Sequence, residues 1–232
     1  MKKVGFVGTY DKIDMMLYTS KILTVLGKKV LVLDATKTQK AKYIVPSINP
    51  TISYITTFEG IDVAIGFENI EQLKKYLYID EDLELPYDVV LIDTDNSQAI
   101  EEFDFYNNEK NFFVTAFDCY SLKRGLETLD MLKMPIELTK ILYSTNMLKE
   151  EDDYLNFLSL EKKIRWDDYR IYFPMSNEDM NAIAECQRAQ KMLFRKLSNQ
   201  YKEGLIYVTQ EIEKDINESQ IRRVVKNLEK GV

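Results

Sequence analysis

Three segments of the sequence place a charged side chain directly after an apolar run. The first runs from Val4 to Lys12 and includes Gly8; the others, Val30 to Asp34 and Val89 to Asp93, each end in an aspartate. A loop whose lysine opens a helix can bind phosphate groups through backbone amides and its ammonium group. A carboxylate at the end of a further strand can hold magnesium. The three segments therefore indicate the chemistry of a nucleotide phosphate site.

Such a site requires a sheet that brings the segments together. Apolar runs of strand length recur along the chain and predict six strands: Val4 to Val7, Lys29 to Leu33, Asp88 to Ile92, Asn111 to Phe117, Leu138 to Ser144 and Arg170 to Phe173. Helix-patterned stretches lie between them: Lys12 to Leu26, Ile70 to Leu77, Leu122 to Leu132 and Glu178 to Leu197. This alternation predicts an α/β fold, a doubly wound, mostly parallel sheet with helices on both faces. Ligands of such sheets bind beyond the carboxyl ends of the strands.

The C-terminal segment from Ile206 to Leu228 is predicted to be helical. We expect one main domain over residues 1–205, with residues 206–232 as a helical extension of the same domain. The simplest interpretation is a structural helix that packs Ile212, Ile216, Ile221, Val225 and Leu228 on the body of the protein. The alternative is an amphipathic helix that contacts a partner or a membrane.

Composition excludes several kinds of chemistry. The 232-residue chain has no histidine, which removes His-based triads and His-ligated zinc. Cys119 and Cys186 are expected to be free, buried thiols rather than metal ligands. A net charge of −7 disfavours nucleic acid as a partner. No apolar run approaches the roughly 20 residues of a spanning helix and no signal peptide is evident, so we expect a cytoplasmic protein.

The order of these motifs resembles the MinD/ParA family of deviant Walker A proteins, in the style of its atypical TadZ/CpaE-like members. The resemblance covers roughly residues 1–200 and rests on a succession of individually weak motifs: Val4 to Lys12, Gly27 to Asp34, Tyr87 to Thr94, Phe113 to Phe117 with Ser121 to Arg124, Asn146, and Phe173-Pro174. It implies a P-loop fold. It also implies candidate nucleotide contacts at Gly8, Lys12, Asp34, Asp93 and the adenine-reading position Asn146, with Asp93 near magnesium if Mg-ATP binds.

The loop departs from the family pattern at the positions on which hydrolysis depends. Counting back from Gly27 places Lys12 on the P-loop lysine, but Val7 stands at the signature lysine. Ile13 stands at the hydroxyl that binds magnesium, and Thr36 at a water-positioning carboxylate. The resemblance therefore implies a degenerate P-loop with no catalytic residues.

Asp11 replaces the glycine before the P-loop lysine and would repel bound phosphates. We expect Asp11 to cap the helix that begins near Lys12, with Asp14 in a capping-box-like pair. The remaining residues also have ordinary explanations. Lys12 could be a surface lysine, Asp93 could end a strand, and Asn146 could belong to a turn.

We therefore expect a catalytically impaired MinD/ParA-like protein that acts as a cytoplasmic positioning or assembly scaffold for a larger membrane or secretion machine. No cofactor is expected in this interpretation. Its expected partners are proteins of that assembly and a second copy of the chain, with only indirect membrane association. The alternative is an active ATP-dependent dimerisation switch that uses ATP and Mg²⁺. A protein that binds nucleotide without hydrolysing it lies between the two.

Overall fold

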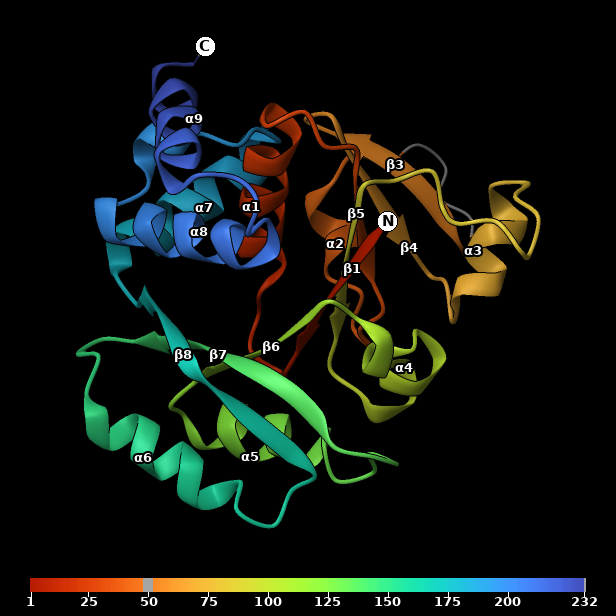
Figure 1. Ribbon diagram of the computed structural model, residues 1–232. Coiled ribbons are helices and arrows are strands. Elements are labelled where there is room, and N and C mark those ends of the chain that lie inside the picture. Colours follow the sequence, from red (N-terminus) through yellow and green to blue (C-terminus); the bar gives the residue numbers. More distant parts are fainter. Residues whose placement is uncertain (48–51, 232) are drawn as a thin grey trace.

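A central sheet organises the molecule, and its architecture is seen in the computed structural model, which describes residues 1–47 and 52–231 (Figure 1). Within these residues the strands are β1 (Lys2–Val7), β2 (Val30–Asp34), β3 (Tyr54–Phe58), β4 (Ile61–Ile65), β5 (Val89–Thr94), β6 (Lys110–Ala116), β7 (Ile136–Ser144) and β8 (Ile164–Pro174). Their order in the sheet is β3-β4-β2-β5-β1-β6-β7-β8. Only the pairing of β3 with β4 is antiparallel among these strands.

Helices surround the sheet. They are α1 (Ile13–Val25), α2 (Ala41–Ile44), α3 (Ile70–Tyr76), α4 (Ser97–Glu102), α5 (Cys119–Glu127), α6 (Lys149–Leu158), α7 (Asn177–Ala189), α8 (Asn199–Ile212) and α9 (Glu218–Lys230), with short 3₁₀ turns at Phe105–Asn107 and Phe194–Lys196. Six of them begin where a polar side chain accepts a first-turn amide. These caps are Asn69, Asn96, Asp118, Ser176, Ser198 and Asn217.

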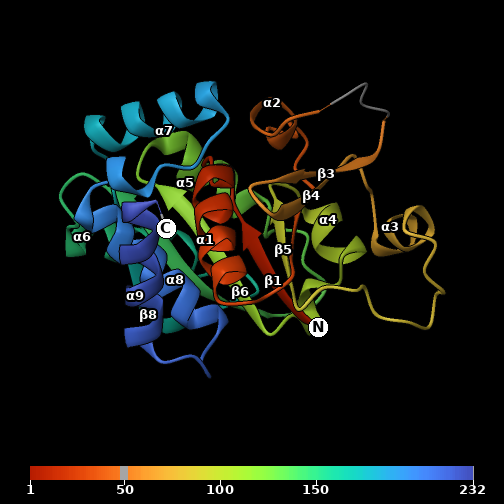
Figure 2. The same ribbon diagram turned by 90° about the horizontal axis from the view of Figure 1, so that it is seen from above.

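The two faces of the sheet form two separate cores because successive strand residues point in opposite directions. Phe6 packs with α1, α8 and α9 on one face, whereas Val7 packs with α4, α5 and α6 on the other. Figure 2 shows α1 over the middle of the sheet with α8 and α9 beside it. The predicted fold class is therefore confirmed, including the helix at the C-terminus.

Two strands were missing from the prediction. β3 is a half-exposed edge strand with two threonines, and an acidic residue interrupts the apolar run of β4. That residue, Asp62, accepts hydrogen bonds from the Thr57 hydroxyl at 2.7 Å and the Tyr87 hydroxyl at 3.0 Å. Local polar pairing therefore takes the place of the apolar pattern that marks the central strands.

Three predicted helices differ from their patterns. The predicted helix from Leu122 to Leu132 ends at Glu127. The predicted helix from Glu178 to Leu197 ends at Ala189, because Gln190 adopts a left-handed conformation with φ of 49°. The predicted single helix from Ile206 to Leu228 is two helices, and residue 206 lies inside α8. Glu213 ends α8 by turning inward, where its carboxylate pairs with Lys2 at 2.9 Å and Lys28 at 3.3 Å.

The expected packing of the C-terminal segment is confirmed. Ile212, Ile221 and Val225 are buried in the core that contains α1, and Ile216 and Leu228 pack against it. Cys186 is buried as expected, but the prediction for Cys119 is wrong because this residue is exposed at the start of α5. Among the described residues, no helix has the length and apolar character needed to cross a membrane.

Candidate functional site

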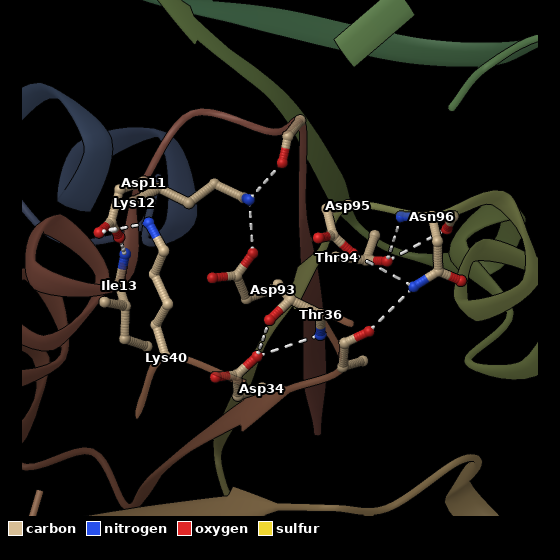
Figure 3. A network of polar contacts seen from close by, with 12 residues as sticks. Asp11, Lys12, Ile13, Asp34, Thr36, Lys40, Asp93, Thr94, Asp95 and Asn96 are labelled. Atoms are coloured by element: carbon tan, nitrogen blue, oxygen red, sulfur yellow. Dashed lines mark hydrogen bonds and ion pairs between the residues drawn. The ribbon is translucent and has the colours of Figure 1, made fainter. Parts of the chain in front are cut away.

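The ends of three neighbouring strands carry the candidate residues. β2 and β5 pair so that Asp34 lies directly opposite Asp93, and β5 pairs on its other side with β1, which leads into Gly8. Figure 3 shows Asp34, Asp93 and Lys12 close together at the carboxyl ends of the strands. Parallel pairing therefore brings together residues that lie far apart in the sequence.

Lys12 is the centre of this arrangement. It is only 3% exposed, and its Nζ donates a hydrogen bond to the Gly8 carbonyl oxygen at 2.6 Å. The same Nζ forms an ion pair with Asp93 Oδ1, also at 2.6 Å (Figure 3). The charge of Lys12 is therefore already neutralised by Asp93 inside the protein.

Gly8 is required by the tight path of the loop. Its φ is +139°, and a Cβ at this position would lie 2.2 Å from the carbonyl oxygen of Val114. Any side chain would collide with β6, so only glycine allows the loop to turn here. This turn aims the Gly8 carbonyl at Lys12.

The Asp93 carboxyl is held in an unusual environment. It is 4% exposed, and burial raises its pKa to about 7, with Asp34 adding to the rise and Lys12 opposing it. Asp93 therefore depends on Lys12 to remain ionised near neutral pH.

The carboxylate of Asp34 accepts hydrogen bonds from the segment that follows it. Oδ1 accepts hydrogen bonds from the Thr36 amide at 3.0 Å and the Thr36 hydroxyl at 2.6 Å. Oδ2 accepts the amide of Ala41 at 2.9 Å, at the start of α2. Asp34 thus shapes the segment between β2 and α2, and Thr36, which the sequence placed at a catalytic position, is its partner.

Asp11 contacts the helix start but not as the expected cap. The N-cap residue of α1 is Lys12, and Asp11 Oδ1 accepts the amide of Ile13 at 3.3 Å. Asp11 Oδ2 pairs with Lys40 at 2.9 Å, a contact that the sequence did not indicate. The expected capping-box-like pair is wrong because the Asp14 side chain turns away and accepts a hydrogen bond from Gln187 Nε2 at 2.8 Å.

The space left at the phosphate position is very small. Its volume is about 20 Å³ and its lining includes Gly8, Lys12, Thr36, Asp93 and Asp95. A single water molecule needs roughly 10–15 Å³, so there is room for about one. Ile13 offers no oxygen to a metal, and Asp11 adds a further negative charge. As these side chains stand, they do not fit a magnesium triphosphate.

Asn146 lies apart from these residues. It is exposed beyond the end of β7, and its amide donates a hydrogen bond to Ser144 Oγ at 3.2 Å. It lines neither the small space around Lys12 nor a larger cavity beside it. The ordinary explanation, a turn asparagine, describes its observed contact.

The larger cavity was not indicated by the sequence. Its volume is about 230 Å³, and it lies between the loop after β1, the ends of β7 and β8, and helices α1, α7 and α8. Tyr10, Asp14 and Tyr143 are among its lining residues. No local motif could reveal it, because its walls come from four separate stretches of the chain: residues 10–15, 143, 174–187 and 201.

Known proteins resemble this chain in structure and not in sequence. No family model and no curated protein matches the sequence. A ParA family ATPase from Chlorobium tepidum is similar in structure, with a TM-score of 0.50, 14% identity, and coverage of 98% of this chain and 97% of that one. MinD in the MinC:MinD cell division complex of Aquifex aeolicus gives a TM-score of 0.53 at 12% identity, covering 97% and 96%. The chain has the ParA/MinD fold.

A third similar structure is a variant of McdA from Cyanothece in complex with ATP. Its TM-score is 0.55 at 9% identity, with coverage of 92% of this chain and 96% of that one. Coverage of nearly the whole chain by all three structures means that the ParA/MinD fold extends to the C-terminal helices. The fold that the sequence resemblance implied is therefore the observed fold.

Proposed function

We propose that this protein is a ParA/MinD-fold scaffold whose phosphate site is closed by its own side chains. In this proposal it is a degenerate, TadZ/CpaE-like form that positions or assembles a larger membrane or secretion machine from the cytoplasm. It needs no bound nucleotide for this role.

The contact of Lys12 with Asp93 and Gly8 carries the proposal. In a P-loop site the lysine ammonium binds phosphate oxygens and the strand-end acid holds the metal shell. Here the two groups neutralise each other at 2.6 Å, and the Gly8 carbonyl takes another of the lysine's hydrogen bonds. A nucleotide would have to break both contacts. Its phosphates would also be repelled by Asp11 and Asp95, which border the same space.

Protein partners follow from the same proposal. MinD of Aquifex aeolicus was solved in complex with MinC, the protein from Chlorobium tepidum is a ParA family ATPase, and the McdA variant was solved with ATP. We infer that this chain keeps partner binding and self-association, as a homodimer, without the hydrolytic cycle. Membrane association would then be indirect, through a partner.

Hydrolysis provides the test. We expect the purified protein to hydrolyse ATP no faster than the Lys12→Ala variant, because Ile13 offers magnesium no oxygen and Thr36 is hydrogen bonded to Asp34. Phosphate release measured with excess Mg²⁺ would show this. Turnover that depends on Lys12 would overturn the proposal.

An active switch remains the second candidate, and the position of Lys12 and Asp93 favours it. Both residues stand at strand ends next to the loop, and their separation would free an ammonium group and a carboxylate. In this alternative, phosphate displaces Asp93 from Lys12. Stabilisation of the protein against heat by ATP and Mg²⁺, absent with magnesium alone, would support the switch over the scaffold.

A further inference from the structure

The cavity beside the closed loop has the dimensions of a small-molecule site. Its volume of about 230 Å³ is more than ten times the space around Lys12. Pockets for drug-sized ligands measure roughly 300–1,000 Å³, so the occupant would be smaller than these. Strand ends and three helices form the walls, so the cavity is built from rigid elements.

Three tyrosines, Tyr10, Tyr143 and Tyr201, contribute to the cavity wall, and Phe173 packs behind them. Tyr10 lies against Tyr143 with ring centroids 4.5 Å apart, and Tyr143 stacks on Phe173 at 5.1 Å. Tyr201 meets the edge of Phe173 at 5.0 Å, and both Tyr143 and Tyr201 are buried. Aromatic faces attract cations and pack well against compact apolar groups. The wall therefore suits a ligand with an apolar body and a positive charge.

The charges at the cavity have a single sign. Three aspartates, Asp11, Asp14 and Asp179, line it, and no lysine or arginine is among its described lining residues. Such a cavity disfavours phosphate, carboxylate or any other anionic ligand. It favours a cation.

The three carboxylates differ in the hydrogen bonds and ion pairs that they already make. Asp179 is buried and bonded to the hydroxyls of Ser176 and Ser198 and to the Ser198 amide. Asp11 is paired with Lys40. Asp14 accepts the hydrogen bond of Gln187 and has no basic side chain in ion-pair contact within the described chain. Asp14 is therefore the carboxylate available to a ligand.

Burial raises the pKa of Asp14, and with the opposing hydrogen bond of Gln187, the added repulsion of Asp11 and the opposing charge of Lys40 the pKa is about 7. The tyrosine hydroxyls of Tyr18 on α1, Tyr143 on β7 and Tyr201 on α8 lie near enough to sense the Asp14 charge. None of these three is a cation. A ligand cation would supply the missing counter-charge.

We propose that this cavity binds a small organic amine with a compact apolar or aromatic body, whose ammonium group pairs with Asp14 while its body packs against Tyr10 and Tyr143. The inference does not depend on whether the protein hydrolyses ATP. The proposed ligand would lie beside the loop that follows β1 and, unlike a nucleotide, would be positively charged.

Three probes of matched size test the proposal: 2-phenylethylamine, 2-phenylethanol and phenylacetate. By isothermal titration at about pH 8, we expect the amine to bind at least about tenfold more tightly than the alcohol, and phenylacetate not to bind, because only the amine completes the Asp14 pair. Equal affinity for amine and alcohol would overturn the proposal. So would preferential binding of phenylacetate or of ATP in this cavity.

Variants locate the binding. Asp14→Asn should weaken amine binding at least about tenfold and leave the alcohol unaffected, since only the charge is lost. Ala184→Leu, which fills the cavity from α7, should abolish binding of both and keeps the test valid if Asp14→Asn fails to fold. Asp153→Asn removes the same charge from the exposed face of α6 and should change nothing. Amine binding that survives Ala184→Leu would contradict the assignment.

Proton linkage gives an independent measurement. Since the Asp14 pKa is about 7, amine affinity should fall roughly tenfold between about pH 8 and pH 6, where the carboxyl becomes protonated. Titration near pH 7 in buffers of different ionisation enthalpy should show proton release on binding. A flat pH profile, or one that persists in Asp14→Asn, would contradict the role of Asp14.

Discussion

At the scale of single residues, the chemistry of the loop is decided by where two opposite charges are placed. The Lys12 ammonium and the Asp93 carboxylate are both buried, and each would be costly to bury alone. Their 2.6 Å contact offsets that cost. The pair is therefore a structural necessity in the closed state, and it uses the groups that a nucleotide would require.

The variant Lys12→Met tests whether buried Asp93 needs Lys12 as its partner. At about pH 8 we expect a loss of about 3–5 kcal/mol in the free energy of unfolding, because Asp93 is left buried without a partner and must either stay ionised or take up a proton. The loss should shrink as the pH falls. Burial raises the pKa of Asp93 above its unfolded value of 3.8, so the native state of the variant takes up a proton that the unfolded state does not.

The control is the double variant Lys12→Met with Asp93→Asn, which removes both charges. Denaturant unfolding at about pH 8 should show it to be more stable than Lys12→Met alone. Equal stability of the single and double variants, or a loss that does not change with pH, would mean that Lys12 does not neutralise Asp93.

At the scale of elements, the approach of α8 to the sheet depends on a residue without a side chain. A Cβ at Gly204 would lie 2.7–2.9 Å from three atoms of the Phe173 ring, which is fully buried at the end of β8. Gly204→Ala should therefore lower stability by about 1–3 kcal/mol through overpacking, despite the better helix propensity of alanine. Thermal or urea unfolding would measure the change.

Gly125 on α5 provides a matched comparison. Its Cβ would meet the Phe113 ring at 3.1 Å, a contact that a small adjustment relieves. Gly125→Ala should cost clearly less than Gly204→Ala. If the two substitutions have the same effect, close packing of α8 on Phe173 is not what the Gly204 position requires.

The helix α9 is expected to stay on the protein rather than bind lipid. Its own residues Ile221 and Val225 are buried against the protein, and Arg222 pairs with Glu203 and Glu218. Residues 209–232 hold five acids and five bases, so they have no net attraction for anionic lipid. We expect no co-sedimentation with vesicles of phosphatidylserine and phosphatidylcholine.

The exposed cations Arg223 and Lys226 test that expectation. If the protein does bind the vesicles, and the double variant Arg223→Glu with Lys226→Glu releases it, then α9 is a membrane-contacting element. Binding that this variant leaves unchanged would place the membrane contact elsewhere and would still contradict the expected absence of binding.

The elements that could be predicted from the sequence are those whose apolar pattern is set by burial on both faces, such as Val30–Asp34 and Val89–Thr94. The edge strand Tyr54–Phe58 has no such pattern because one side of it is exposed. The end of α8 was missed because it depends on Glu213 meeting Lys2, a contact across 211 positions. Long-range polar contacts of this kind leave no local signal.

The candidate site likewise has features that could be predicted from the sequence and features that could not. Gly8, Lys12 and Asp93 are expected together because their segments have the layout of a phosphate site, and the register of β1 and β5 explains why they meet. The hydrogen bond from Lys12 to the Gly8 carbonyl oxygen could not be predicted, because it depends on the path of the loop after β1. The contact of Asp14 with Gln187 spans 173 positions and could not be predicted. Both residues line the larger cavity.

At the scale of the whole molecule, the protein combines a fold that is known from ATPases with a loop that closes on itself. The helices α7, α8 and α9 complete the covering of one face of the sheet, and the three compared structures span nearly the whole chain. In the proposed scaffold, partner surfaces are retained while the nucleotide cycle is absent. Assembly would then be governed by partner concentration rather than by ATP.

Equilibrium binding of ATP is the most direct test of this account. Isothermal titration of the wild-type protein with ATP in the presence of Mg²⁺ should show no binding tighter than about 1 mM, because a triphosphate must break the Lys12–Asp93 pair and enter a space of about 20 Å³. Micromolar binding that is lost in the double variant Lys12→Met with Asp93→Asn would contradict the account, because it would mean that the closed loop opens to admit the nucleotide.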